Sequence, residues 1–550
     1  MAGACNHITK YLIRHCWLLS IFEVLEIHTQ QATQEILGFV TNPFFLISVI
    51  FWGVVFVLVF VLGRLKKSKA LSVFFPFLVM LKTKRLNKFL KRLAKLSPKA
   101  WKVIFTIGIF VSFSFTIYGF YYFTKNLIVL IGSLFSGSTP PAESQISPLI
   151  PGLTINFETF LYLIIPILFV LTTHELAHAI SANADGIPVK STGVFGMGVF
   201  FIIGFGAFVE IDEKRYKRGN FTGWQKTRLA SAGSFFNSIL ALITLLMVIN
   251  FPALISLSYK NRYGVHVNEV LSTEEGGYNE GILLAGDVIF DINGTALKDD
   301  INLQVYLQNF TTQNDTLECL IQRDGSLINV TVQTGPPPDG HPYPDIAYIG
   351  VLTEYWWPPR GWFSNLLGGT FPNTFLIELY WTWVIAISVT LFNMMPVWVF
   401  DGDKVVYEII NYVIKSKREK RQLTETFEVT GSDFKLVEFN PIRIELVNSV
   451  QMLVPDERGG HEKTKLEEFQ DYQLVDSNND GYPDHATFEI RDEPLPQDAT
   501  IEVNYTADVD AKEKQKKLVM NVIRITTLSI ILLNFIISAL TMGFQLPFTG

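Results

Sequence analysis

The segment His174-Glu175-Leu-Ala-His178 contains residue types that bind and use a metal ion. In a helix, residues four positions apart lie on the same face, so both imidazoles can reach one metal. Glu175 lies beside them, where its carboxylate could take a proton from a water molecule at that metal. The pattern predicts a metal-dependent hydrolytic site. The competing interpretation is a solvated helix end on which His174 and His178 are merely exposed.

A catalytic zinc site normally has three protein ligands and a water, so a third ligand is needed. The candidate is Asp401, near the end of the stretch 393–403, which reads NMMPVWVFDGD. Pro396 ends a helix and frees backbone groups that must line protein or water rather than lipid. Gly402 is expected to let the chain turn tightly behind Asp401. The alternative is an ordinary turn where the chain leaves the membrane.

The composition is that of a membrane protein. The chain has 550 residues, of which 17% are charged and 49% hydrophobic, and its 45 phenylalanines equal Lys and Arg combined. Soluble globular chains usually contain about 25% charged residues. The net charge of -6 gives no reason to expect nucleic-acid binding. The three cysteines are scattered, so neither a disulfide framework nor a cysteine zinc site is predicted.

Six apolar segments are long enough to cross a bilayer, which requires about 20 residues. They are Pro43–Gly63, Val103–Phe123, Phe160–Ile180, Ala230–Asn250, Phe375–Val397 and Leu518–Met542. Between Arg64 and Lys102 the chain carries thirteen Lys or Arg residues and no Asp or Glu. Because basic loops stay in the cytosol, this loop is predicted to be cytosolic. The predicted metal site then faces the cytosolic side, and the stretch from about Tyr259 to Asn373 lies outside.

The two metal-binding segments together resemble the signatures of the site-2 protease family, which are intramembrane zinc metalloproteases. Further matching segments are Pro151-Gly152-Leu153, the run Gly204–Glu210 and Gly233-x-x-x-Asn237. The resemblance implies zinc (Zn2+) bound by His174, His178 and Asp401, with Glu175 as the base. It also implies polar contacts from Asn237 and Asn393 to the substrate or to the oxyanion. Hydrogen bonding between helices is the other explanation for these two asparagines.

The apolar, glycine-spaced run Gly193–Gly204 is too short to cross the membrane and predicts a hairpin or re-entrant strand. The family resemblance implies a membrane-embedded β-hairpin whose edge pairs with an extended substrate, which would replace broken helix hydrogen bonds. The predicted substrate-binding residues are Gly196, Gly198, Val199 and Phe200. The alternative is an apolar loop packed between helices.

The segment after Tyr263 resembles a PDZ domain. Gly281 to Gly294 is followed by a helix-like run at Ile301–Phe310 and by a hairpin with its turn at Asp324-Gly325. Such a domain accompanies the family and is expected to bind substrate termini, unless it is an inert spacer. The aromatic stretch Tyr355–Phe363 predicts a belt at the outer membrane interface, without a catalytic role.

The region from Glu425 to Asp508 is polar and alternating, which predicts a β-rich domain, and its basic flanks predict a cytosolic location. Within it, four residues have the oxygen spacing of a calcium (Ca2+) loop, namely Asp476, Asn478, Asp480 and Asp484. The glutamate expected at the twelfth position is replaced by Thr487. An Asp/Asn-rich turn without calcium is the alternative.

The sequence thus predicts a polytopic α-helical membrane protein with about six transmembrane helices, a zinc site between core helices, an inserted PDZ (α+β) domain and a β-rich cytosolic domain. The predicted function is an intramembrane zinc metalloendopeptidase that cuts single-pass membrane proteins in the bilayer. The alternatives are a membrane zincin that cleaves juxtamembrane or soluble peptides, and a catalytically silent scaffold.

The predicted divisions of the chain follow from these motifs and composition changes. They are an N-terminal membrane region at 1–150, the first half of the protease core at 151–257, the PDZ domain at 258–337, the aromatic segment with the third core helix at 338–414, the β-rich domain at 422–510 and a C-terminal transmembrane helix at 515–550.

Overall fold

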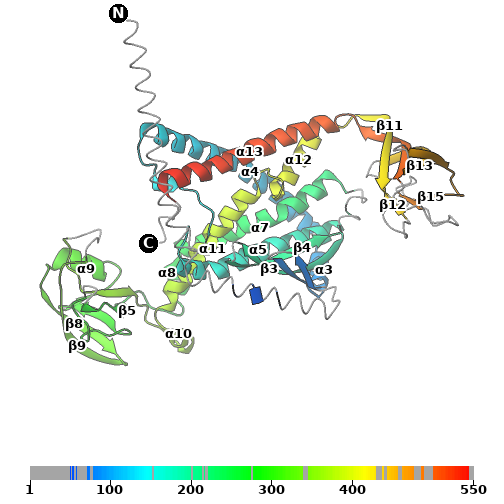
Figure 1. The fold of residues 1–550 in the computed structure, drawn as a ribbon. Helices are drawn as coiled ribbons and strands as arrows, with labels where there is room; N and C mark the ends of the chain where they lie inside the picture. Colours follow the sequence, from blue (N-terminus) through cyan, green and yellow to red (C-terminus); the bar gives the residue numbers. More distant parts are fainter. Residues whose placement is uncertain are drawn as a thin grey trace, which may run out of the picture. The chain divides into compact units, whose positions relative to one another are not determined.

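A computed structural model describes most of the chain from residue 85 onward and short pieces before it (Figure 1). The described residues are 50, 53–54, 57, 71–74, 78–83, 85–150, 154–199, 202–212, 216, 221–273, 277–338, 345–428, 436–438, 443–455, 461–475, 485–487 and 500–543. The chain forms two compact units. The first contains residues 1–160, 170–238 and 388–550, and the second contains residues 161–169 and 239–387.

Five helices among the described residues are long and apolar enough to cross a membrane, which makes the chain an integral membrane protein. They are α4 (Pro98–Ser136), α5 (Phe157–Asp185), α7 (Gly223–Ile249), α11 (Phe371–Asn393) and α13 (Glu513–Met542). They correspond to five of the six predicted spans. The sixth, Pro43–Gly63, lies almost entirely outside the described residues.

Polar side chains join the helices of the first unit. Asn126 of α4 and Asn534 of α13 share a buried hydrogen bond of 2.9 Å, and Asn534 also donates to the carbonyl of Phe123 at 2.9 Å. The hydroxyl of Ser112 in α4 donates to the carbonyl of Ser231 in α7. Inside a membrane protein such groups lack water, so pairing them across helices fixes which faces meet.

The predicted hairpin is present as β3 (Val189–Val199) and β4 (Ile202–Ile211), which pair antiparallel. Two strands from the basic stretch extend it, β1 (Leu71–Phe74) and β2 (Leu78–Thr83), and give the order β1-β2-β3-β4. Helix α3 (Arg85–Leu96) follows and buries Leu90 and Ala94, which lie one turn apart. The predicted cytosolic loop therefore contains structure that the sequence analysis did not predict.

The segment after α11 is shaped by close backbone packing. Helix α11 ends at Asn393, before Pro396, and α12 (Asp401–Val413) begins at the predicted third ligand. Gly402 lies in the first turn of α12, so its predicted role in a tight turn is wrong. A Cβ atom there would lie 2.1 Å from the carbonyl oxygen of Met394, so glycine is needed for close approach.

The second unit contains a six-stranded sheet, in which β10, β5, β6, β8 and β9 are adjacent in that order and β7 pairs with β6. The strands are β5 (Val265–Val270), β6 (Val288–Ile292), β7 (Thr295–Ala296), β8 (Thr316–Arg323), β9 (Ser326–Gln333) and β10 (Val351–Tyr355). Its short helices are α8 (Phe251–Ile255), α9 (Leu303–Phe310) and α10 (Trp362–Leu367). The predicted helix-like run and hairpin are both found, the latter with its turn at Asp324-Gly325.

The described residues of the β-rich region before α13 form two sheets. One has the order β11-β17-β13-β14 and the other β12-β16-β15. Their strands are β11 (Arg418–Glu428), β12 (Leu436–Glu438), β13 (Arg443–Pro455), β14 (His461–Leu466), β15 (Gln473–Val475), β16 (His485–Thr487) and β17 (Thr500–Asp510). The predicted calcium residues Asp476, Asn478, Asp480 and Asp484 lie outside the described residues.

Candidate metal centre

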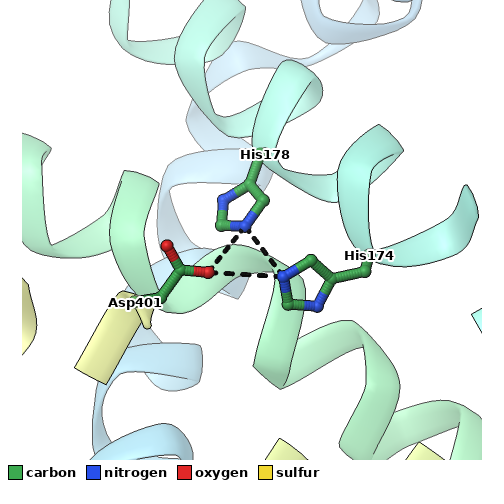
Figure 2. A group of neighbouring side chains, drawn as sticks. All are labelled: His174, His178 and Asp401. Atoms are coloured by element: carbon green, nitrogen blue, oxygen red, sulfur yellow. Dashed lines mark hydrogen bonds and ion pairs between the residues drawn. The ribbon is translucent and has the colours of Figure 1, made fainter. Parts of the chain in front are cut away.

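Two imidazoles of α5 and the carboxylate at the start of α12 meet in the first unit (Figure 2). His174 Nε2 lies 3.3 Å from Asp401 Oδ2 and 3.1 Å from His178 Nε2, and His178 Nε2 lies 3.0 Å from Asp401 Oδ2. The side chains are 7%, 12% and 13% exposed for His174, His178 and Asp401. Residues 227 positions apart in the chain thus present three ligand atoms to one point.

The spacing of these atoms fits a metal ion. Ligands of a tetrahedral zinc at 2.0–2.1 Å lie roughly 3.3 Å from one another. The three observed separations, 3.0, 3.1 and 3.3 Å, are close to that value. Without a shared cation or proton, two imidazole nitrogens and a carboxylate oxygen would not be stable so close together in a buried place.

The ring nitrogens that face away from the cluster also have partners. His178 Nδ1 lies 2.7 Å from the carbonyl oxygen of Leu229 on α7, an acceptor that requires Nδ1 to carry the proton. His178 Nε2 is then left as the unprotonated, ligand atom. The bond fixes both the tautomer and the orientation of the ring.

Asn237 of α7 contacts the ring nitrogen of His174 that faces away from the cluster. Its Nδ2 is placed 3.1 Å from His174 Nδ1, and its fully buried Oδ1 has no hydrogen-bond partner among the described residues. Exchanging the oxygen and nitrogen of this amide, which are nearly indistinguishable by shape, gives Oδ1 a partner in the Nδ1–H group. His174 Nε2 is then the unprotonated nitrogen and is free to bind a metal.

Helix α7 supports α5 in two further ways. The guanidinium of Arg228 donates two hydrogen bonds, of 2.8 and 2.7 Å, to the carboxylate of Asp185 at the end of α5. Gly233 faces the His174 ring, where a Cβ atom would lie 2.4 Å from Cε1 and Nε2. Only glycine at this position leaves room for the imidazole of His174. The sequence pattern alone did not give this reason for Gly233.

Asn393, the last residue of α11, is in contact with the cluster. Its Nδ2 donates to Asp401 Oδ2 at 2.9 Å and lies 3.1 Å from His174 Nε2. The backbone N–H of Asp401 donates in turn to Asn393 Oδ1 at 3.4 Å. Both predicted asparagines thus lie beside the candidate ligands.

Glu175 points to the hairpin sheet. Its Oε2 accepts a hydrogen bond of 3.0 Å from the backbone N–H of Val209 in β4. This bond orients the carboxylate. Val209 lies in the run Gly204–Glu210 that resembles the family, but that resemblance did not predict its bond to Glu175, which depends on where β4 passes α5.

Two cations stabilise the segment that carries Asp401. Lys404 Nζ donates to Asp401 Oδ1 at 3.2 Å. Two residues further on, Asp403 accepts two hydrogen bonds of 2.6 Å from Arg524 of α13. Sequence reasoning did not identify Arg524.

The predicted substrate-binding residues lie in or beyond β3. Gly196 pairs with Val79 on one side and with Phe205 on the other, so neighbouring strands occupy both of its sides. Gly198 and Val199 pair with β4 near the tip of the hairpin, and Phe200 lies outside the described residues. The strand of this hairpin at the end of the sheet is β4.

Comparison with known proteins gives related sequences. The sequence profile of peptidase family M50 matches residues 162–353. An uncharacterized protein of Methanocaldococcus jannaschii is 25% identical over 369 residues, which cover 65% of this chain and 82% of that protein. A membrane-bound transcription factor site-2 protease homolog of Arabidopsis thaliana is 24% identical over 216 residues, 39% of each protein.

Among solved structures, the PDZ domain of an SdrC-like protein from Listeria monocytogenes aligns with 16% of this chain and 86% of its own, at 20% identity and a TM-score of 0.14. A score this low carries no argument about the fold, and the PDZ domain stays a prediction. The sequence matches, in contrast, confirm the resemblance to the site-2 protease family.

Proposed function

We propose that this chain, with its likeness to peptidase family M50, is a zinc metalloendopeptidase that cleaves peptide bonds within the transmembrane segments of other membrane proteins. The observation that carries the proposal is the meeting of His174, His178 and Asp401 within 4.8 Å, beside Glu175. Two imidazoles and a carboxylate are a donor set that suits zinc. These three residues would hold the metal, which when bound supplies Lewis-acid activation of water and of the scissile carbonyl.

Glu175 is proposed to carry the proton. Its Oε2 is fixed by the Val209 N–H, which leaves Oε1 to take a proton from the attacking water and to deliver it to the leaving amine. The amide of Asn393 donates toward the cluster and is proposed to stabilise the developing oxyanion. Asn237 is proposed to hold the His174 ring rather than to touch substrate, because its partner is the distal nitrogen.

A transmembrane helix must unwind before its peptide bonds can react, because each carbonyl is hydrogen-bonded within the helix. We propose that the unwound substrate pairs with the outer edge of β4. The N–H groups of a strand point alternately to its two sides, so Phe205 and Ala207 direct theirs to the same side as Val209. This edge leads to Glu175, through the bond from Val209. We propose this edge of β4 as the substrate-binding strand in place of the predicted residues Gly196, Gly198, Val199 and Phe200.

The orientation proposed from the basic stretch between Arg64 and Lys102 puts the metal centre toward the cytosolic side. The substrates would be single-pass membrane proteins in the same bilayer. The sheet of the second unit, with its predicted PDZ identity, would bind substrate termini outside and select chains that have already been shortened.

The test uses the purified full chain, reconstituted with a reporter protein that has one transmembrane helix. The wild type is expected to cut within the helix, and Glu175→Gln is expected to bind zinc but not to cut. A soluble peptide of the same sequence serves as a second substrate. Equal cleavage by wild type and Glu175→Gln would end the peptidase proposal, and cleavage of the soluble peptide alone would replace it with a peptidase of juxtamembrane or soluble substrates.

A further inference from the structure

A cavity of about 650 Å³ in the second unit is lined by cationic and aromatic side chains. Its cations are Lys260, Arg262 and Lys298, which come from the loop before β5 and from the turn after β7. Trp356 and the residues around α10 form another wall. The volume is within the range of sites for small molecules, about 300–1,000 Å³. The peptidase proposal gives this cavity no role.

The guanidinium of Arg262 is held between aromatic rings, but its Nε has no hydrogen-bond partner among the described residues. Its guanidinium carbon lies 4.1 Å from the ring centre of Tyr355 and 4.8 Å from that of Trp357. These cation–π contacts fix the planar group. Its Nε is buried and makes no hydrogen bond among the described residues, and the nearest carboxylate oxygen, Asp299 Oδ1, is 3.5 Å away. A rigid guanidinium whose Nε donor is unpaired is preorganised for an anion.

The charge of the cavity is unbalanced. Among the described residues, no Asp or Glu lines it. Within the described residues, the ammonium groups of Lys260 and Lys298 take part in no ion pair, and Asp299, the partner of Arg262, is 54% exposed. Three cations gathered around one cavity repel one another, so an anion placed among them would be bound favourably.

The cavity is lined by residues that lie close in sequence to the ends of apolar helices. Lys260 follows closely after α8, which continues the apolar helix α7, and Gly369 lies just before the apolar helix α11. Close in sequence to the lining residues, Leu257, Trp362 and Leu366 are 90%, 80% and 74% exposed. Large apolar side chains that flank cations at helix ends are typical of the headgroup region of a bilayer.

We propose that this cavity binds the phosphate of a phospholipid headgroup. Arg262 would donate two parallel hydrogen bonds to the phosphate oxygens, while Lys260 and Lys298 supply charge. The exposed apolar residues would lie against the acyl chains of the same lipid, which favours a lipid over free phosphate. The site would anchor the second unit at a fixed depth in the membrane. The proposal does not depend on peptidase activity, so either can fail without the other.

The test is a titration of the full chain in detergent with dioctanoyl phosphatidylglycerol, followed by native mass spectrometry. One tightly bound lipid is expected for the wild type. Arg262→Gln is expected to bind about tenfold more weakly, as fits the loss of a charged hydrogen-bond donor. Lys298→Gln, at an exposed position, should weaken binding severalfold. This variant tests the site if Arg262→Gln does not fold. Arg360→Gln, an exposed cation outside the lining, is the matched control and should bind as the wild type does.

Three competing compounds identify what is recognised. Dioctanoylglycerol, which lacks the phosphate, should not compete for the site, and millimolar inorganic phosphate should compete only weakly. Unchanged binding by both Arg262→Gln and Lys298→Gln would overturn the proposal, as would equal binding of dioctanoylglycerol. Inorganic phosphate that binds as tightly as the lipid would overturn the lipid assignment. Displacement by a peptide with a free C-terminal carboxylate, but not by phosphate, would identify a peptide site instead.

Discussion

The backbone N–H of Val209 donates a hydrogen bond of 3.0 Å to Glu175 Oε2, and so joins the outer edge of the hairpin sheet to the proposed general base. In the proposed mechanism, a substrate strand added to β4 would therefore run toward the Glu175 carboxylate. Substrate pairing and proton transfer then depend on the same short stretch of backbone.

Glu175→Gln should separate catalysis from metal binding. Glutamine keeps the shape of the side chain and an oxygen for the Val209 N–H, but it cannot accept the proton. The cleavage rate is expected to fall about 10²–10⁴-fold, the usual contribution of a general base. Zinc content, measured on the same samples by mass spectrometry, should stay at the wild-type level, and its loss would contradict the role assigned to Glu175.

Ala207→Pro tests the edge of β4. Proline removes the N–H that would pair with substrate, and one such bond contributes about 0.5–1.5 kcal/mol. A severalfold lower rate of reporter cleavage is expected, with unchanged zinc content. Ala207→Val, which keeps the N–H and suits a strand, is the control. If both variants cleave at the wild-type rate, β4 is not the strand that the substrate joins.

Gly233→Ala should weaken zinc binding without loss of the fold. The added Cβ would displace the His174 ring, from which it would lie 2.4 Å away. Disturbing the support of a ligand typically costs about 10–100-fold in metal affinity. Competition with a fluorescent zinc chelator measures this loss. Gly132→Ala, in an open part of α4, should leave the affinity unchanged. Equal affinity for both variants would contradict the contact.

Arg524→Gln should destabilise the segment that carries Asp401. The change leaves the buried carboxylate of Asp403 without its partner, and breaking a buried ion pair in this way costs about 3–5 kcal/mol. A lower melting temperature and weaker zinc binding are expected. The double variant Asp403→Asn/Arg524→Gln, which removes both charges, should recover much of the stability. A single variant as stable as the double one would argue against the pair.

Cys319 reports on the core of the second unit. Burial, with the nearby Asp291 carboxylate, raises the pKa of its thiol to about 12, and the residue is 1% exposed. Because the thiolate is the reactive form, N-ethylmaleimide should not label Cys319 at pH 8 until the domain unfolds. A Cys5→Ser/Cys16→Ser background isolates this thiol. Fast labelling of the native protein would contradict the described core.

Much of the metal centre could be predicted from local patterns. The i, i+4 spacing of His174 and His178 requires only a helix, and Asp401 follows from the need for a third ligand. Apolar segment length predicted the five helices that the structure describes as long enough to span. These features depend on nearby residues or on a strong chemical constraint.

The rest depends on contacts between distant segments. Strands β1 and β2 lie in a basic stretch whose charge dominates its composition, and their pairing with β3 has no local signal. The same holds for Arg524, which finds Asp403 only because α13 packs beside α12. Gly402 was assigned to a turn because glycine favours turns, but a neighbouring carbonyl is what excludes a side chain there.

X-ray absorption at the zinc K edge tests the central claim most directly. For the full chain loaded with one equivalent of zinc, the spectrum should show two imidazoles with nitrogen at about 2.0–2.1 Å and oxygen ligands at similar distance. In the double variant His174→Ala/His178→Ala the imidazole scattering should disappear. The same two-imidazole spectrum in that variant, or a wild-type spectrum of oxygen ligands alone, would contradict a metal centre at His174, His178 and Asp401.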